Sequence, residues 1–457
     1  MMNKDLWDQI EHFDFDHPAS EYDFSLRLAN ENYWTQNFTK LAILEYKKFM
    51  YLAAVSDEMV SPSEIIDTVW HQHLIFTKSY HEFCQILGKN IQHIPSTHSK
   101  EDFQKFKIAK DRTSQLYKDH FGNQPDDIWS KSSPFESLNL KKSGFKLRTA
   151  IIIGIMSFIL LSFPLYFLLK PLYLAIPNPY FIILYLGLII ISLAGLEWYN
   201  KRKFDQAINL FDKNSFAFNL EPYELIYFRN RNILSIIQGS IHELIDNNSI
   251  QITANKTITA NLLTFVKSKE QRQVIDVLKD LGTTTYTPFL LQLIGKPVFS
   301  NIKKSMDQFD KYFNRSKIFS NLFVFNFIAF LILTMTGLLR IVNGIFREKP
   351  IVQISFAVIF IIFLMIGYLY RLTHLLSRKF LPDIYRKEIL SKRNNGHDWQ
   401  WSYFLMGTAV LTTSFTSLAT SKNSDSTSGS SETSSSSDSS CGGSSCSSCG
   451  GCGGGGD

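Results

Sequence analysis

Charged residues are missing from four long stretches of this 457-residue chain. An α-helix needs roughly 20 apolar residues to cross a bilayer, and inside lipid it satisfies its own backbone hydrogen bonds. We therefore predict spanning helices at residues 149–169, 176–196, 318–339 and 350–370. These stretches also lack His, whereas transporters and proton pumps usually carry an ionisable residue at membrane depth. Four such spans, arranged as two hairpins, favour an anchor over a transport path.

The N-terminal sequence is acidic and has no apolar h-region, so we expect no cleaved signal peptide. Basic residues cluster where each span meets residues 1–140, 200–316 or 371–400, and fewer occur in the opposite loops. The clusters are Lys141, Lys142, Lys146, Arg148, Lys201, Arg202, Lys203, Lys311, Arg315, Lys317, Arg371, Arg378 and Lys379. The positive-inside rule then predicts a cytoplasmic N-terminus, although Arg340, Arg347 and Lys349 in the second outer loop weaken the bias.

Cysteine is scarce: Cys84 stands alone, and four more lie in the last 17 residues. A cytoplasmic location disfavours disulfides. The tail cysteines are Cys441, Cys446, Cys449 and Cys452, and their two C-x-x-C steps make them candidate metal ligands. The ion would be a soft transition metal, as Zn, Cu or an Fe–S cluster. The alternative is a low-complexity tail with reduced thiols, because no folded shell is predicted around them.

The metalloprotease pattern H-E-x-x-H is absent, and we find no catalytic constellation. Residues 1–140 are predicted to form a helical domain, with helices at 39–55, from Ser61 to Leu87, and from Ser99 to Gly122. Ser61 is the predicted N-cap of the second helix, with Pro62 at its first position and Glu64 closing a capping box.

Four polar residues of this domain are candidate metal ligands, namely Asp67, His71, His73 and His93. Asp67 and His71 are four residues apart and can meet on one helical face. His71 and His73 are roughly 200° apart around a helix, so a regular helix cannot direct both at one ion. The preferred alternative is a packing stripe that includes Trp70, with the polar groups satisfied locally.

Several motifs occur in a fixed order along residues 20–130. They are F-S-L-R-L-A at 24–29, E-Y-K-K-F at 45–49, S-P-S at 61–63, D-x-x-W-H-x-H-L at 67–74, H-x-P at 93–95 and F-G-x-x-P-x-x-I-W at 121–129. This order resembles the bacterial domain named glycine-rich domain-containing protein-like. The resemblance implies no biochemical activity. The family often has two adjacent histidines before the proline, where this chain has Gln92 and His93, which argues against a shared metal site.

Residues 200–316 are predicted to form a second cytoplasmic domain. Its segment 220–262 follows the order helix, helix, strand, turn, strand, which is winged-helix-like. Residues 220–282 hold seven Lys/Arg and seven Asp/Glu, so this domain lacks the positive charge that supplies most non-specific DNA affinity. We expect a protein-interaction module and no nucleic-acid partner. Residues 286–313 are predicted to form one long helix that leads into the third span.

The segment L-E-P-Y-E-L-I-Y at 220–227, between two pairs of spans in a chain that ends in Gly and Cys, resembles a second, uncharacterised bacterial membrane-protein family. That resemblance covers about 200–457 and implies a membrane protein of unknown role.

Residues 371–400 form a basic juxtamembrane segment. Residues 401–419 are uncharged with seven Ser/Thr, and favour a locally packed helix, with a fifth span as the alternative. Residues 421–457 have a Ser/Gly/Cys-rich composition typical of disorder.

The predicted fold is therefore mainly α: a helical N-terminal domain, four spans, a small α+β middle domain and a disordered tail. We predict a multi-pass protein of the bacterial inner membrane, with the lipid bilayer and unidentified proteins as partners. Its predicted role is a non-enzymatic anchor or interaction protein without a cofactor. The alternative is a metal-binding or metal-dependent protein that uses the N-terminal histidines or the tail cysteines.

Overall fold

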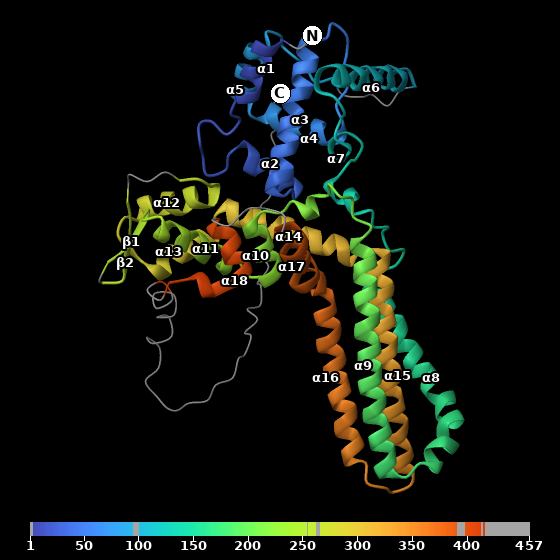
Figure 1. Ribbon diagram of the computed structural model, residues 1–457. Helices are drawn as coiled ribbons and strands as arrows, with labels where there is room; N and C mark the ends of the chain where they lie inside the picture. Colours follow the sequence, from blue (N-terminus) through green and yellow to red (C-terminus); the bar gives the residue numbers. More distant parts are fainter. Residues whose placement is uncertain are drawn as a thin grey trace, which may run out of the picture.

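The computed structural model describes residues 3–94, 100–253, 255–261, 266–390, 398–412 and 415. A helical N-terminal domain lies at one end of the molecule, and four long helices extend from the other end (Figure 1). The middle domain and the C-terminal helices lie between them. One continuous core of buried side chains runs through the N-terminal, middle and C-terminal parts.

The four long helices are α8 (Leu147–Ala175), α9 (Asn178–Ile208), α15 (Lys317–Phe346) and α16 (Val352–Thr373). Each is long and apolar enough to cross a membrane, so the four predicted stretches are confirmed as long apolar helices. The helices run past the charges that bounded the predicted spans: α8 includes Lys170, and α15 includes Arg340. A lysine or arginine near a helix end is tolerated because its long side chain can reach the membrane surface.

Both hairpin turns of this bundle lie at the end remote from the other domains (Figure 1). There the Arg340 guanidinium donates hydrogen bonds to the carbonyl oxygens of Tyr173 and Ile176, at the turn between α8 and α9. Pro164 and Pro171 lie inside α8, which curves along its length in Figure 1. Proline removes a backbone donor and crowds the preceding turn, so it accounts for this bend.

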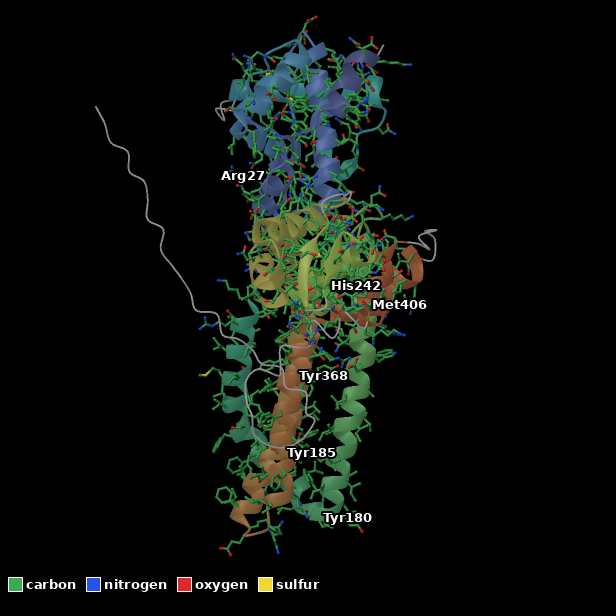
Figure 2. All side chains as sticks on the ribbon, turned by 90° about the vertical axis from the view of Figure 1, so that its left-hand side faces the viewer. Arg27, Tyr180, Tyr185, His242, Tyr368 and Met406 are labelled. Carbon is green, nitrogen blue, oxygen red and sulfur yellow. The ribbon has the colours of Figure 1, made fainter. Side chains whose placement is uncertain are left out.

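Helix α15 packs against the other three long helices. A buried pair of asparagines joins it to α9: Asn200 and Asn326 exchange hydrogen bonds of 3.0 and 2.7 Å, and Asn200 also donates to the Tyr368 hydroxyl of α16. This buried pair therefore links α9 to α15 within the bundle. Nearer the start of α9, the Tyr185 hydroxyl donates to the Leu333 carbonyl of α15 at 2.8 Å. Figure 2 labels Tyr185 and Tyr368 at different levels of the bundle.

Within the described residues of the N-terminal domain, the regular secondary structure is helical, as predicted. Its helices are α1 (Lys4–His12), α2 (Phe24–Asn32), α3 (Gln36–Val55), α4 (Glu64–Ile75), α5 (Thr77–Leu87), α6 (Lys100–Phe121), α7 (Asp126–Trp129) and a 3-10 turn (Pro134–Leu138). The predicted helix from Ser61 to Leu87 is wrong in two respects. It begins at Glu64 with Ser63 as the N-cap, whose hydroxyl also donates to the Ile128 carbonyl, and it is broken at Phe76.

The middle domain begins with a 3-10 turn (Phe216–Phe218), α10 (Pro222–Asn230) and α11 (Ile233–Asp246). An antiparallel sheet of order β1-β2-β3 follows, from β1 (Ile250–Ile252), β2 (Thr257–Ala260) and β3 (Thr284–Thr285), with Ile252 opposite Ile258. The helix–helix–hairpin order agrees with the prediction, whereas β3 adds a third strand from outside the predicted segment, and α12 (Lys269–Leu281) packs against β2.

The single helix predicted at 286–313 is wrong, because α13 (Tyr286–Ile294) ends at Gly295 and α14 (Pro297–Asn314) begins two residues later. A proline cannot donate the hydrogen bond that a continuous helix would need there, and it is favoured at a first helical turn.

After α16 the chain forms π-helical turns (Leu376–Phe380 and Tyr385–Ile389) around α17 (Leu381–Ile384), then α18 (Trp399–Met406) and a 3-10 turn (Gly407–Val410). Helix α18 packs against α10 and α11 with Trp401, Tyr403 and Phe404 buried. Its 8 residues cover about 12 Å, whereas a span needs about 30 Å. Of the stretch considered as a fifth span, residues 413, 414 and 416–419 lie outside the described residues. Residues 421–457, with the four candidate cysteines and the predicted disorder, lie outside the described residues.

Candidate metal centre

The candidate ligands Asp67 and His71 lie one turn apart on α4, as their spacing predicts. The Nδ1 atom of His71 lies 3.3 Å from one Asp67 carboxylate oxygen. The Nε2 atom of His93, from the segment after α5, lies 2.9 Å from the other oxygen. One ligand atom from each of the three residues lies within 4.8 Å of the other two. The structure thus brings together three of the four candidate ligands of this domain.

His93 reaches α4 because buried contacts hold the segment around Ile91. The Tyr80 hydroxyl of α5 donates to the Ile91 carbonyl and accepts a 3.1 Å hydrogen bond from the Trp70 indole of α4. The Trp70 ring also packs edge-on against the His93 imidazole, with ring centroids 4.7 Å apart. Trp70 and Tyr80 therefore orient His93 without being ligands themselves, as groups around metal sites commonly do.

His73 lies apart from the cluster and is fully buried. Its ring nitrogens lie 2.9 Å from the Tyr46 hydroxyl and 3.2 Å from the Ser79 hydroxyl, so both have partners. Burial lowers the pKa of His73 to about 3, so this imidazole stays neutral. The turn of roughly 200° between residues 71 and 73 sends their side chains to opposite sides of α4. His73 is a residue of the aromatic core, and its inclusion among the candidate ligands is not supported by its position.

Two of the three converging groups, Asp67 and His93, border a cleft of about 510 Å³ beside α4, which Phe49, Val60 and Trp70 also line. The side chain of His93 is 17% exposed, that of Asp67 36% and that of His71 57%. The site can therefore be reached from solvent. Three protein ligands on one side of an ion would leave positions for water or another ligand.

The donor set of two imidazoles and one carboxylate suits Zn²⁺ or Fe²⁺, whereas Mg²⁺ and Ca²⁺ prefer oxygen ligands. Tetrahedral ligands about 2.1 Å from Zn²⁺ lie about 3.4 Å apart. The two imidazole nitrogens lie 3.3 and 2.9 Å from different oxygens of Asp67, and the three ligand atoms lie within 4.8 Å of one another. The same separations also allow hydrogen bonds from both imidazoles to Asp67. Those hydrogen bonds would tie the segment after α5 to α4.

A family model described as UCP032817-like matches residues 10–110, which include Asp67, His71 and His93. The matched family is uncharacterised and covers a minor part of the chain. The two resemblances that the sequence motifs carry stay predictions. No curated protein and no solved structure matches the chain.

Proposed function

We propose that this chain is a multi-pass membrane protein whose N-terminal domain binds one transition-metal ion through Asp67, His71 and His93. The observation that carries the proposal is the convergence of their three ligand atoms within 4.8 Å of one another. The two imidazole rings lie with their centroids only 4.4 Å apart. If both rings were protonated, their charges would repel, whereas two neutral rings can share one bound cation.

We further propose the anchor role, in which the bundle holds the folded domains at one face of the bacterial inner membrane with the N-terminus in the cytoplasm. Two features support it. Both hairpin turns lie at the same end of the bundle, so all the other domains lie at the opposite end. That end carries the basic residues expected on the cytoplasmic side. In this role the metal stabilises the N-terminal domain or a partner contact, and we propose no enzymatic reaction.

The test is the metal content of anaerobically purified full-length protein, beside a version that ends after Thr420, measured by mass spectrometry. We expect near-stoichiometric zinc or iron in both. His71→Ala and Asp67→Asn should each lose the bound metal. Mutation of a residue that only supports a ligand weakens metal binding by roughly 10-fold or more, and removal of one of three ligands should weaken it at least as much. His81→Ala is the matched control, since His81 is an exposed histidine of α5 that contacts Gln85 at 3.1 Å.

Three other results of the metal analysis would contradict a site at Asp67, His71 and His93. Metal that disappears with the tail would assign binding to the cysteines at 441–452. Metal retained by Asp67→Asn and His71→Ala would exclude the cluster as its site. Protein without metal in both versions, from metal-replete cells, would leave only the anchor role, and identification of protein partners would follow.

A further inference from the structure

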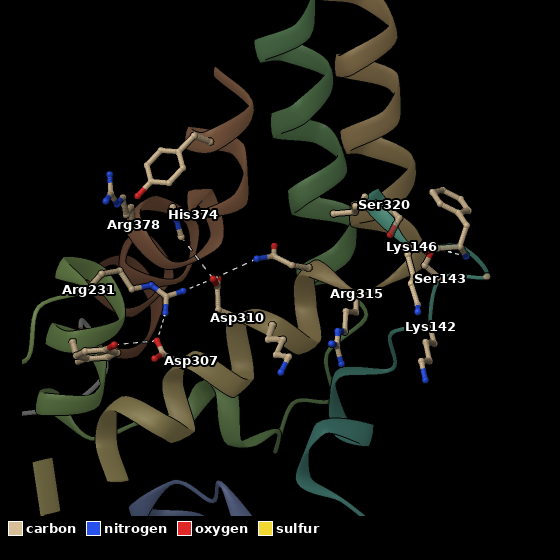
Figure 3. A pocket seen from close by; sticks show the side chains of 17 residues that line it. Lys142, Ser143, Lys146, Arg231, Asp307, Asp310, Arg315, Ser320, His374 and Arg378 are labelled. Carbon is tan, nitrogen blue, oxygen red and sulfur yellow. Dashed lines mark hydrogen bonds and ion pairs between the residues drawn. The ribbon is translucent and has the colours of Figure 1, made fainter. Parts of the chain in front are cut away.

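A large pocket lies where the long helices join the middle domain, and it is separate from the candidate metal centre (Figure 3). Its volume is about 1000 Å³. Four parts of the chain line it: the segment 142–147 that leads into α8, the junction of α14 with α15, the end of α16, and the end of α10. Because α8, α15 and α16 are candidate spans, the pocket lies at the level where the membrane would meet the soluble part.

On the α10 side of the pocket, one guanidinium group contacts two carboxylates. The Arg231 guanidinium pairs with Asp307 at 2.7 Å and also with Asp310. The Tyr227 hydroxyl donates to Asp307 at 3.0 Å, and the His374 Nδ1 atom lies 3.7 Å from the Asp310 carboxylate. Both acidic residues that line the pocket therefore already pair with Arg231, whose single positive charge offsets one of their two negative charges.

The remaining charge in the lining is positive. Five further cationic side chains line the pocket: Lys142, Lys146, Lys311, Arg315 and Arg378. Within the part of the chain that the structure describes, none of the five forms an ion pair. Figure 3 shows Lys142, Lys146 and Arg315 on one side, and Arg378 near His374 on the other. An anion that entered between them would meet cations without having to displace a carboxylate.

A second, apolar groove begins beside this pocket. It runs between α8 and α15, has a volume of about 890 Å³, and shares Phe145 with the pocket. Its lining is almost wholly apolar, and Ile153, Leu161, Phe327 and Leu331 are typical members. The groove follows two candidate spans, so its natural occupant is a hydrocarbon chain.

We propose that the pocket and the groove together bind one anionic phospholipid. The phosphate lies among the unpaired cations of the pocket, and an acyl chain lies in the groove between α8 and α15. The basic lining selects the negative charge of the headgroup, as basic pockets between spanning helices do. The adjoining groove selects a lipid over a free phosphate ion, because only a lipid has a hydrocarbon chain to fill it.

The experiment uses the full chain purified in a mild detergent and incubated with phosphatidylglycerol, phosphatidylcholine or inorganic phosphate. Native mass spectrometry then counts the molecules retained. We expect retention of phosphatidylglycerol in preference to phosphatidylcholine, and no retention of phosphate. Lys146→Gln should weaken phosphatidylglycerol binding about fivefold, since a cation near an anionic headgroup contributes a factor of about five. Lys201→Gln is the matched control, because Lys201 is exposed near the same end of the bundle and does not line the pocket.

A second pair of variants tests the groove without changing charge. Ser157→Trp places a bulky ring in the groove and should lower lipid retention, whereas Ile159→Trp, on an exposed face of α8 outside the groove, should not. Equal retention of the two lipids, or equal losses in Lys146→Gln and Lys201→Gln, would overturn the proposal in favour of a diffuse surface effect. Retention of inorganic phosphate at the same site would overturn it in favour of a soluble anion.

Discussion

Glu224 lies in the first turn of α10 and is fully buried where the N-terminal domain meets the middle domain. One oxygen of its carboxyl group accepts a 2.8 Å hydrogen bond from the backbone N–H of Gln36, in α3, and the other accepts one of 2.9 Å from the N–H of Glu221. Burial raises the pKa of Glu224 to about 8, and the nearby carboxylates of Glu221 and Glu270 act in the same direction. The side chain therefore carries a proton at neutral pH.

The raised pKa of Glu224 determines how the free energy of unfolding changes with pH. An unfolded chain loses the Glu224 proton near pH 4.5, whereas the folded chain holds it until about pH 8. Between these values the folded state binds more protons than the unfolded state, so the free energy of unfolding falls as pH rises. The contribution is complete below pH 4.5 and is lost as pH rises through 8. Between pH 6 and pH 8 the loss is about 2 kcal/mol.

The perturbation is Glu224→Gln, which has nearly the same shape and does not titrate. Thermal unfolding of the detergent-solubilised full chain, followed by tryptophan fluorescence, compares wild type and variant at pH 6 and pH 8. The variant is expected to be less stable at pH 6, because an amide oxygen cannot accept from both backbone N–H groups as the carboxyl group does. Its additional loss between pH 6 and pH 8 should be smaller than that of wild type. Equal losses in the two proteins would refute the reasoning, and Glu82→Gln, at an exposed carboxylate, is the control.

Two predictions concern the bundle, and both are checked by thermal unfolding in detergent. A Cβ at Gly337 would overlap the side chain of Val358 on α16, so Gly337→Ala should cost about 1–3 kcal/mol, whereas Gly367→Ala, with open space around it, should cost little. Asn326→Leu leaves Asn200 without its reciprocal partner and should cost about 1–2 kcal/mol. Replacing both asparagines with leucine should recover part of that loss, and a purely additive double variant would contradict the pairing.

Only part of the candidate metal centre could be predicted from the sequence. The spacing of Asp67 and His71 places them on one helical face in any regular helix, and the structure confirms that they face each other at 3.3 Å. The approach of His93 depends on the break at Phe76 and on the contacts of Tyr80 and Ile91, which turn the chain back toward α4. No local pattern indicates such a return, because it arises from packing between two helices.

The boundaries of the helices likewise depend partly on local sequence and partly on tertiary contacts. Ser61 and Ser63 both precede helix-forming residues, so capping rules alone could not choose between them. The choice follows from tertiary contacts: the Ser63 hydroxyl donates to the Ile128 carbonyl, and the Ser61 N–H donates to the Thr113 hydroxyl. The docking of the N-terminal domain is likewise tertiary, since Lys269 of α12 pairs with Asp23, which is more than 240 residues away along the chain.

The sequence by itself determined the four long helices, because an uncharged apolar run satisfies its backbone hydrogen bonds as a helix wherever it lies. It also determined that His71 and His73 point apart, since helical geometry is local. Only the tertiary structure decided that His93 joins Asp67 and His71, that Glu224 is buried between two domains, and that five cations surround one pocket next to an apolar groove. These arrangements bring together residues far apart in the chain, and their proximity depends on the sum of many packing contacts.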